Sequence, residues 1–191
     1  MDTKTAERAA LLAKADLVSD LVGEFPELQG IMGGYFAKND GESNEVAKGI
    51  AQHYRPEQSG SALPEGPIAS VVALADKIDT LTGLFGINEP PTGSRDPFAL
   101  RRQALGVIRI CIENRVSVDI IDCFHKSEAI YGRGFKIDTT LEYIFDRLYG
   151  YYSDRGISKD VVEAAISKPV KDGNLVTLDA TIRALNEFQA S

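Results

Sequence analysis

The chain has 191 residues, of which 43% are hydrophobic, and its 28 acidic and 21 basic side chains give a net charge of −7. This composition supports one good-sized domain, or a domain with a smaller companion, and excludes wholesale disorder. No run approaches the ~18 apolar residues of a membrane helix, and the first residues lack the uncharged core of a signal peptide. The acidic balance excludes a protein that binds nucleic acid with its whole surface, so any such binding needs a local basic patch.

The amino-terminal half is predicted to form helices separated by turns. Apolar residues that recur near every 3.6 positions predict a first helix over residues 6–22. A proline in a first helical turn opens a second segment over residues 25–41. Ser43 is placed to cap a third helix over residues 44–54. A loop rich in proline and glycine then leads to a long apolar helix over residues 67–86.

The long helix is apolar around most of its circumference, which is typical of a buried central helix. After a second rigid loop, Asp96 and Pro97 resemble an N-cap followed by a first-turn proline and predict a helix over residues 97–112. Further helices are expected over residues 119–131, 139–155, 158–167 and 178–188, with residues 174–178 as a short strand candidate. The expected fold class is all-α.

One stretch carries a pattern with chemical meaning. Between residues 50 and 81, a histidine, a proline-glycine loop and the helix "ALADKIDTL" follow one another. This order resembles part of the metal site of the HD superfamily of phosphohydrolases, with His53 and Asp76 in ligand-like places. The defining His-Asp dipeptide is missing, because Asp16 follows an alanine, and Phe25 stands where a further histidine is often found. A catalytic metal typically keeps about three protein ligands plus water, and these scattered survivors do not supply that set.

We therefore expect Asp16, His53 and Asp76 to be vestigial positions that bind no metal and serve structural roles. A histidine at a helix end is favourable because its positive form meets the helix dipole. Asp76 and Asp79 are expected to cap helices or to pair with arginines. An active HD-type metal phosphohydrolase remains an alternative interpretation.

Three stretches carry a second resemblance: "AALLAKADLVSDLVGEFPELQGIMGGYFA", "VALADKIDTLTGLFGI" and "PTGSRDPFALRRQALGVIRI". They resemble the central part of the β subunit of bacterial glycyl-tRNA synthetase, which contains a degenerate HD-type helical domain. The likeness covers nearly the whole chain and is looser after residue 112. It implies an HD-superfamily-like helical domain over residues 1–112. A smaller helical linker domain over residues 113–191 would then lead toward an anticodon-binding domain that lies outside this chain.

The resemblance also implies a function. In that family a separate α subunit carries the aminoacylation site and binds ATP and Mg, while the β subunit is required for tRNA binding and charging. No P-loop or GxGxxG phosphate signature occurs here, so we expect no catalytic residues and no cofactor in this segment. The implied partners are the α subunit, in an α2β2-type assembly, and tRNA(Gly), with no membrane. Cys111 and Cys123 are too far apart for a CxxC pair, which also fits a reduced cytoplasmic setting.

Four arginines are the candidate tRNA contacts. Arg95, Arg101, Arg102 and Arg109 lie in or just before the helix over residues 97–112, which contains no acidic residue. At 100° per residue, Arg102 and Arg109 fall within about 20° of each other on the helix surface, whereas Arg101 points about 100° away. Such a strip would bind RNA phosphates. The alternative is that these arginines bind carboxylates or carbonyls within the protein, and that the segment is a structural spacer.

Overall fold

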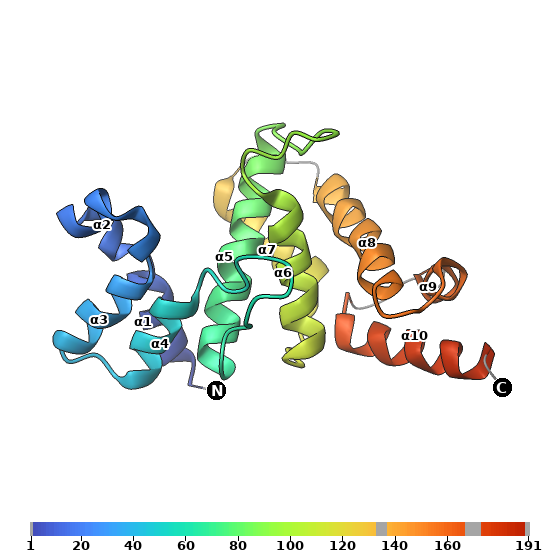
Figure 1. Cartoon of the computed structure of the whole chain (residues 1–191), viewed down its shortest axis with the longest axis horizontal. Coiled ribbons are helices and arrows are strands. Elements are labelled where there is room, and N and C mark those ends of the chain that lie inside the picture. The colour runs from blue at the N-terminus through green and yellow to red at the C-terminus, as the bar shows by residue number, and fades with distance from the viewer. Residues whose placement is uncertain (1, 133–136, 167–172, 190–191) are drawn as a thin grey trace. The chain divides into compact units, whose positions relative to one another are not determined.

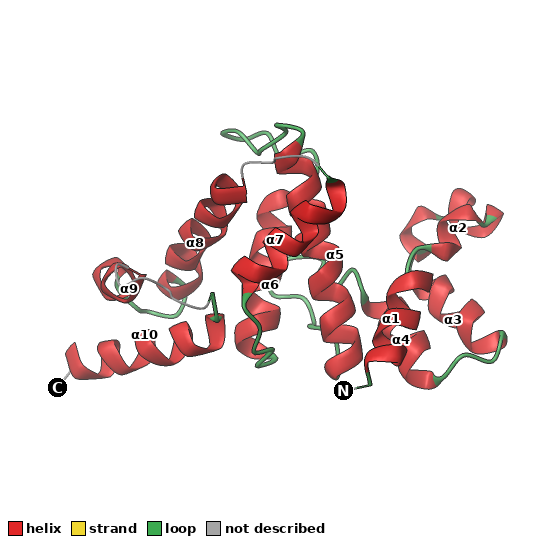
Figure 2. Cartoon of the chain, turned by 180° about the vertical axis from the view of Figure 1, so that it is seen from behind, coloured by secondary structure: helices red, strands yellow, loops and turns green. Residues whose placement is uncertain are grey.

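The computed structural model describes residues 2–132, 137–166 and 173–189. These residues form helices and loops with no β-strand, so the prediction of an all-α fold is confirmed (Figures 1 and 2). The strand-like pairing that they contain is limited to isolated bridges between Thr92 and Arg95 and between Asp119 and Asn174. Among these residues, no helix has both the length and the apolar character to span a membrane.

The chain divides into two compact units, Met1–Asp76 and Lys77–Ser191. The helix α5 contributes its first part to one unit and its second part to the other. The expected domain boundary after residue 112 stays a prediction. The first unit contains α1 (Thr3–Leu12), the 3-10 helix η1 (Ala15–Val18), α2 (Asp20–Glu24), the 3-10 helix η2 (Pro26–Leu28), α3 (Ile31–Asn39), α4 (Asn44–Gln52) and the first part of α5 (Pro67–Gly86).

The prediction of one continuous helix over residues 6–22 is wrong. The helix α1 ends at Leu12, and the chain continues as η1 and α2. Two side chains explain the break. Asp16 is turned into the protein, where it is 2% exposed, and Ser19 accepts a hydrogen bond from the Val22 amide as the N-cap of α2. Ser19 bonds backbone groups that a continuous helix would have used itself, and Asp16 bonds amides of a distant segment.

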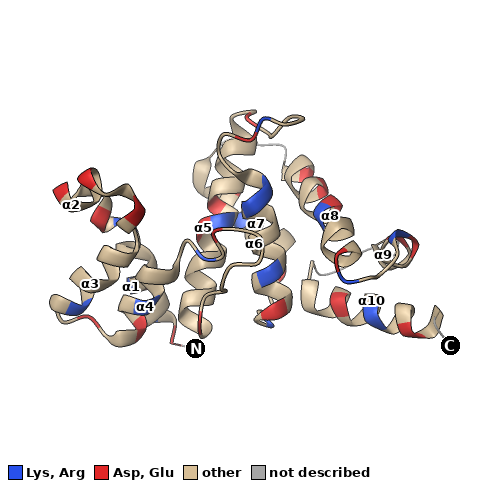
Figure 3. Cartoon of the chain, viewed as in Figure 1, with Lys and Arg blue, Asp and Glu red and all other residues tan. Residues whose placement is uncertain are grey.

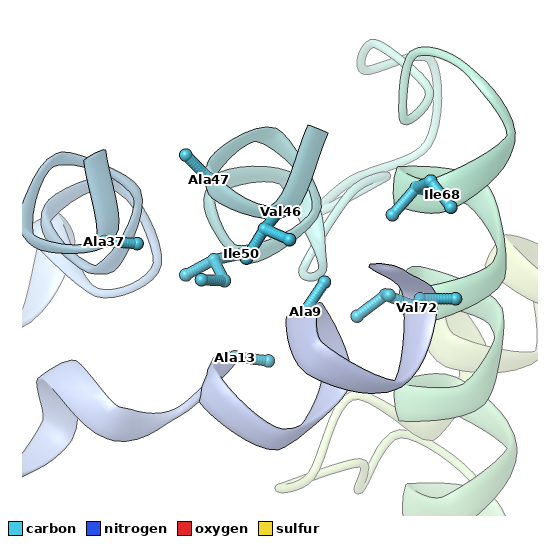
Figure 4. Close-up of a cluster of buried hydrophobic side chains, with 9 residues drawn as sticks. Ala9, Ala13, Ala37, Val46, Ala47, Ile50, Ile68 and Val72 are labelled. Atoms are coloured by element: carbon cyan, nitrogen blue, oxygen red, sulfur yellow. The ribbon is translucent and has the colours of Figure 1, made fainter. Parts of the chain in front are cut away.

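Small side chains fill the core of the first unit. Figure 4 shows alanines of α1, α3 and α4 turned toward one another, with larger aliphatic side chains of α4 and α5 beside them. At Gly34 in α3, an added Cβ would lie 2.7 Å from the Cβ of Ala51, so only glycine allows the observed approach of α3 to α4. The buried cluster consists of Ala6, Ala9, Ala13, Ala37, Val46, Ala47, Ile50, Ile68 and Val72.

The second unit contains the remainder of α5 and five further helices in the described ranges. The helix α6 packs against α8 and α10, α8 packs against α7 and α9, and α9 packs against α10. The helices are α6 (Leu100–Glu113), α7 (Ile120–Tyr131), α8 (Ile137–Ser153), α9 (Lys159–Ile166) and α10 (Leu175–Gln189). Residue 167, the expected end of the helix that begins near residue 158, lies outside the described residues.

The expected start of the helix at residue 97 and the strand candidate over residues 174–178 differ from the structure. Asp96 does act as a cap, because its carboxylate accepts hydrogen bonds from the amides of Leu100 and Arg101, but the regular helix begins only at Leu100. The intervening Ala99 has a left-handed backbone with φ 55°. The strand candidate over residues 174–178 is also wrong. Asn174 there accepts hydrogen bonds from two amides of α10 and caps that helix.

The prediction that α5 is buried is confirmed for most of its apolar positions and wrong for Ala75, which is exposed. Gly83 does not close this helix, which continues to Gly86. An added Cβ at Gly83 would lie 2.7 Å from the hydroxyl oxygen of Tyr131, so the glycine makes room for α7. The buried apolar residues of α5 are Ile68, Ala69, Val72, Ala73, Leu74, Ile78 and Leu81.

Candidate functional site

Asp16 caps α3. One oxygen of its carboxylate, Oδ2, accepts hydrogen bonds from the Gly30 amide at 2.6 Å and from the Gly33 amide at 3.0 Å. Gly30 precedes the first residue of α3 and has a φ of 77°, which favours glycine. The first amides of a helix have no partner within the helix, so a buried carboxylate there satisfies them and interacts favourably with the helix dipole. Asp16 therefore has a structural role that needs no metal.

His53 lies beside this cap. It is fully buried, and its Nδ1 lies 2.6 Å from the carbonyl oxygen of Ile50. Since a carbonyl can only accept, Nδ1 carries the proton and donates it. The ring stacks on Tyr54 with 3.8 Å between centroids. An added Cβ at Gly30 would lie 3.1 Å from the Tyr54 ring and 3.5 Å from the His53 ring, so Gly30 packs against both rings.

Burial keeps His53 neutral. Burial is the largest influence on the imidazole and lowers its pKa from the ordinary value of 6.5. The Ile50 carbonyl and the carboxylates of Asp76 and Asp16 act in the opposite direction, while the Lys14 ammonium lowers the pKa further. The sequence-based expectation that the positive form of His53 is favoured by the helix dipole is therefore wrong, because desolvation outweighs the dipole.

Asp76 is bound by a lysine. Its carboxylate is 7% exposed, and Oδ1 lies 2.6 Å from the Nζ of Lys14, which follows the end of α1. The same ammonium lies 5.9 Å from the centroid of the Tyr54 ring. Asp79, three residues further along α5, accepts a hydrogen bond from the Tyr131 hydroxyl at 3.0 Å. Both aspartates thus serve as acceptors within the protein.

The structure brings the three vestigial positions together, as their resemblance to a metal site implies, since the charges of Asp16 and Asp76 both act on His53. Their donor atoms do not form a metal centre. In the described part of the chain, no group of three or more His, Cys, Asp or Glu side chains is arranged to hold a metal ion. Phe25, at the expected place of a histidine, is half exposed at the end of α2. These residues do not fit a hydrolytic metal, and the absence of bound metal stays a prediction.

The arginines near the start of α6 fall into two environments. Arg95 is exposed in the loop before α6, and its backbone pairs with Thr92. Arg101 is half-buried and donates from its guanidinium to the Gly93 carbonyl, which ties the first turn of α6 to the same loop. Arg102 is exposed on the next position of the helix. Arg101 and Arg102 thus lie in the first turn of α6, and Arg95 lies in the loop that precedes it. Figure 3 shows basic residues in blue on α6 and on this loop.

Arg109 belongs to a different cluster. Its guanidinium is 12% exposed and pairs with Glu113 one turn later, at 3.1 Å. Glu113 also accepts hydrogen bonds from Arg155 at 3.0 Å and from the Tyr151 hydroxyl at 3.4 Å. The Arg155 guanidinium lies 3.7 Å from the centroid of the Tyr151 ring. Glu113 thus links α6 to the end of α8, and this geometry favours a packing role for Arg109.

Sequence reasoning missed Lys14 and Glu113. Lys14 stands two positions before Asp16 in the sequence. A lysine so close to a candidate carboxylate site indicates a possible counter-charge for a buried aspartate. Glu113 ends the run without acidic residues that contains the candidate arginines. Its position four residues after Arg109 is the spacing of a helical ion pair.

Comparison with known proteins agrees with the sequence resemblance. Residues 1–167 match the family described as "Glycyl-tRNA synthetase beta subunit". The chain is 48% identical over 184 residues to a glycine–tRNA ligase β subunit of Methylobacillus flagellatus, covering 94% of this chain and 26% of that protein. It is 49% identical over 186 residues to the one of Acidovorax ebreus, covering 95% and 25%, and 44% identical over 193 residues to the one of Actinobacillus succinogenes, covering 98% and 28%.

The chain therefore spans about a quarter of the length of these relatives. The family match and several relatives above 40% identity, which cover nearly all of the chain, agree on the same protein family. This chain belongs to the glycyl-tRNA synthetase β subunit family, a component of an aminoacyl-tRNA synthetase.

Proposed function

We propose that this chain is the helical region of a glycine–tRNA ligase β subunit that helps to position tRNA(Gly) for charging and has no catalytic site of its own. Family membership supports the general role. The observation that carries the finer proposal is the group of three cations, Arg95, Arg101 and Arg102, at the first turn of α6 on an otherwise acidic protein. Phosphate contacts position RNA without reading its sequence, and a local group of arginines is sufficient for them.

The geometry gives Arg101 a defined position. Its hydrogen bond to the Gly93 carbonyl and the Asp96 cap hold the loop and the first turn of α6 together. A guanidinium fixed in this way loses less side-chain entropy when it meets a phosphate. Arg109 was part of the same candidate strip, but its pairing with Glu113 makes it the weakest of the four candidates.

Catalysis is assigned elsewhere in this proposal. Aminoacylation would take place on the α subunit, which would bind glycine, ATP and Mg in an α2β2-type assembly in the cytoplasm. The described residues present a helix cap, a buried neutral histidine and a lysine-bound carboxylate where the HD resemblance placed metal ligands. This arrangement supports a degenerate site rather than a phosphohydrolase.

The test is the double charge reversal Arg95→Glu and Arg101→Glu in the assembled α–β enzyme. We expect glycyl-adenylate formation to be retained and tRNA charging at limiting tRNA to fall about tenfold, because two phosphate contacts become repulsive. The affinity for tRNA should also depend less steeply on salt, by about one unit of slope for each lost contact. Circular dichroism and thermal melting would confirm that the variant is folded.

The double reversal Lys4→Glu and Lys38→Glu is the matched control, since both lysines are exposed cations, on α1 and α3, and the pair carries the same change of charge. It should leave charging and the salt slope unchanged. If the double variant is folded and charges tRNA normally, the arginines have structural duties and the segment is a spacer between other parts of the subunit. Loss of adenylate formation would instead place the defect in the contact with the α subunit.

A further inference from the structure

The first unit exposes an unusual amount of apolar surface in one short segment. Of the thirteen large hydrophobic side chains exposed among the described residues, seven lie between residues 17 and 36, including Val18 at 91% and Tyr35 at 66% exposure. They belong to η1, α2, the turn into η2, and α3, short elements that pack on one another. We call these side chains the 17–36 surface: Leu17, Val18, Leu21, Phe25, Ile31, Tyr35 and Phe36.

A pocket adjoins this surface. It has a volume of about 390 Å³ and lies between α1, η1, α3 and α4. Leu12, Ala15 and Ile50 give it apolar walls, and Phe36 belongs both to the pocket and to the 17–36 surface. Pockets of this kind receive the anchoring side chains that dominate the binding energy of protein interfaces. Large exposed apolar patches on a folded unit mark contacts with other proteins.

The charges around the surface restrict what can cover it. Residues 15–37 contain four acidic residues and no lysine or arginine. Asp16 is buried in the α3 cap, which leaves the exposed Asp20, Glu24 and Glu27 in the same segment as the apolar side chains. Asp40 and Glu42 add carboxylates at the pocket, where Arg8 pairs with Glu42 and leaves Asp40 to add a further negative charge. The phosphates of RNA would repel these carboxylates, which disfavours RNA as the partner. The carboxylates of a second copy of this surface would repel them as well, which disfavours a symmetric dimer.

The remaining occupant is a protein surface with an apolar centre and a basic rim. We propose that this occupant is part of the same β subunit, from outside residues 1–191, docked on the 17–36 surface with an apolar side chain in the adjoining pocket. The chain spans about a quarter of its relatives' length, so most of the subunit is available for this contact. A segment in the same polypeptide is always present, at an effective concentration set by the connecting chain, which favours it over a separate subunit.

The contact can be mapped by photo-cross-linking in the full-length β subunit, with and without the α subunit. Val18 is replaced by p-benzoylphenylalanine, and the cross-linked peptides are identified by mass spectrometry. We expect cross-links to β-subunit peptides outside residues 1–191, rich in apolar residues with flanking lysine or arginine, in the β subunit alone and equally in the α–β enzyme. Cross-links only to the α subunit, to a second β subunit, to tRNA or within residues 1–191, or no cross-link at all, would overturn the proposal.

A second experiment tests whether the partner surface has a basic rim. The triple reversal Asp20→Lys, Glu24→Lys and Glu27→Lys should lower the yield of the Val18 cross-link about fivefold, because attraction becomes repulsion. The same label at Ile130 on α7, which is 83% exposed and lies outside this surface, is the matched control and should keep its cross-link pattern in the triple variant. An unchanged Val18 yield in the folded variant contradicts a basic partner. This result is independent of tRNA positioning, because the test measures no tRNA binding or charging.

Discussion

Lys14 and Asp76 form an ion pair between two segments that are far apart in the sequence. The Lys14 Nζ lies 2.6 Å from Oδ1 of Asp76, whose carboxylate is 7% exposed. A resemblance to HD hydrolases would place this carboxylate on a metal, and here an ammonium group neutralises it. Asp76 is thus a nearly buried negative charge whose counter-cation comes from the protein itself.

Loss of Lys14 should destabilise the protein, because it leaves a nearly buried carboxylate without its counter-charge. For Lys14→Met we expect a loss of about 1–3 kcal/mol in the free energy of unfolding, reduced from the fully buried case because the lysine is half exposed. Urea denaturation measures it. Lys126→Met is the matched control, since Lys126 also lies 2.6 Å from an aspartate, Asp122, but both groups are exposed. A loss no larger than that of the control would contradict a stabilising role for the Lys14 pair.

Asp16→Ala should melt the start of α3. The substitution removes the acceptor of the Gly30 and Gly33 amides, and we expect a loss of about 2–3 kcal/mol with faster hydrogen exchange at both amides. Asp2→Ala removes an N-cap of α1 that is exposed to water, and its effect should be clearly smaller. Unchanged exchange at the two glycine amides would show that the cap is dispensable.

The stability of the protein should depend on pH through His53. Burial lowers the pKa of His53 in the folded state below 6.5, so between the lowered value and 6.5 the unfolded chain binds more protons than the folded one. Stability therefore falls as the pH drops below about 6.5, by at most ~1.4 kcal/mol per pH unit for one proton. The slope of unfolding free energy between pH 7.5 and 5 should be shallower in His53→Gln. Equal slopes in the two proteins would contradict the prediction.

Substitutions at two neighbouring positions of α5 distinguish the effect of burial on stability from the effect of helix propensity. Leu74 is 4% exposed and Ala75 is exposed, although the two positions are only about 100° apart around the helix axis. Leu74→Asp should cost more than about 4 kcal/mol and leave the protein aggregated or unfolded, because it buries an unpaired carboxylate. Ala75→Asp should remain folded and change stability by about 1 kcal/mol or less. Differential scanning calorimetry compares the two, and a soluble Leu74→Asp with unchanged Tm would place the helix at the periphery.

We expect no stoichiometric transition metal at the Asp16, His53 and Asp76 positions. The reason is that one carboxylate caps α3, the other binds Lys14, and the histidine Nδ1 donates to a carbonyl. Elemental analysis of the purified protein measures the metal content. One equivalent of bound metal, together with phosphodiester hydrolysis that Asp76→Ala abolishes, would show a functional centre.

Local signals in the sequence were sufficient for the fold class and for several helix ends. Ser43 accepts from the Val46 amide as expected, and the helix after it runs over Asn44–Gln52. Asp96 caps α6 as its position before Pro97 indicated, although the helix starts three residues later than expected. Caps and turns depend on hydrogen bonds between residues only two to five positions apart, so the sequence displays both partners. The family resemblance was likewise visible in short continuous strings.

Only the tertiary structure decided what the candidate site residues do. Asp16 reaches an amide 14 residues away, and Lys14 reaches an aspartate on α5, 62 positions further along the chain. Burial lowers the pKa of His53, whereas a helix end alone would favour the positive form, and burial follows from packing rather than from the position of a residue in its helix. The continuous helix expected over residues 6–22 failed for the same reason, because long-range hydrogen bonds of Asp16 outweigh local helical periodicity. Sequence patterns indicate interactions between residues that are close along the chain. The roles of these residues depend on residues that are distant in the sequence and that only folding brings together.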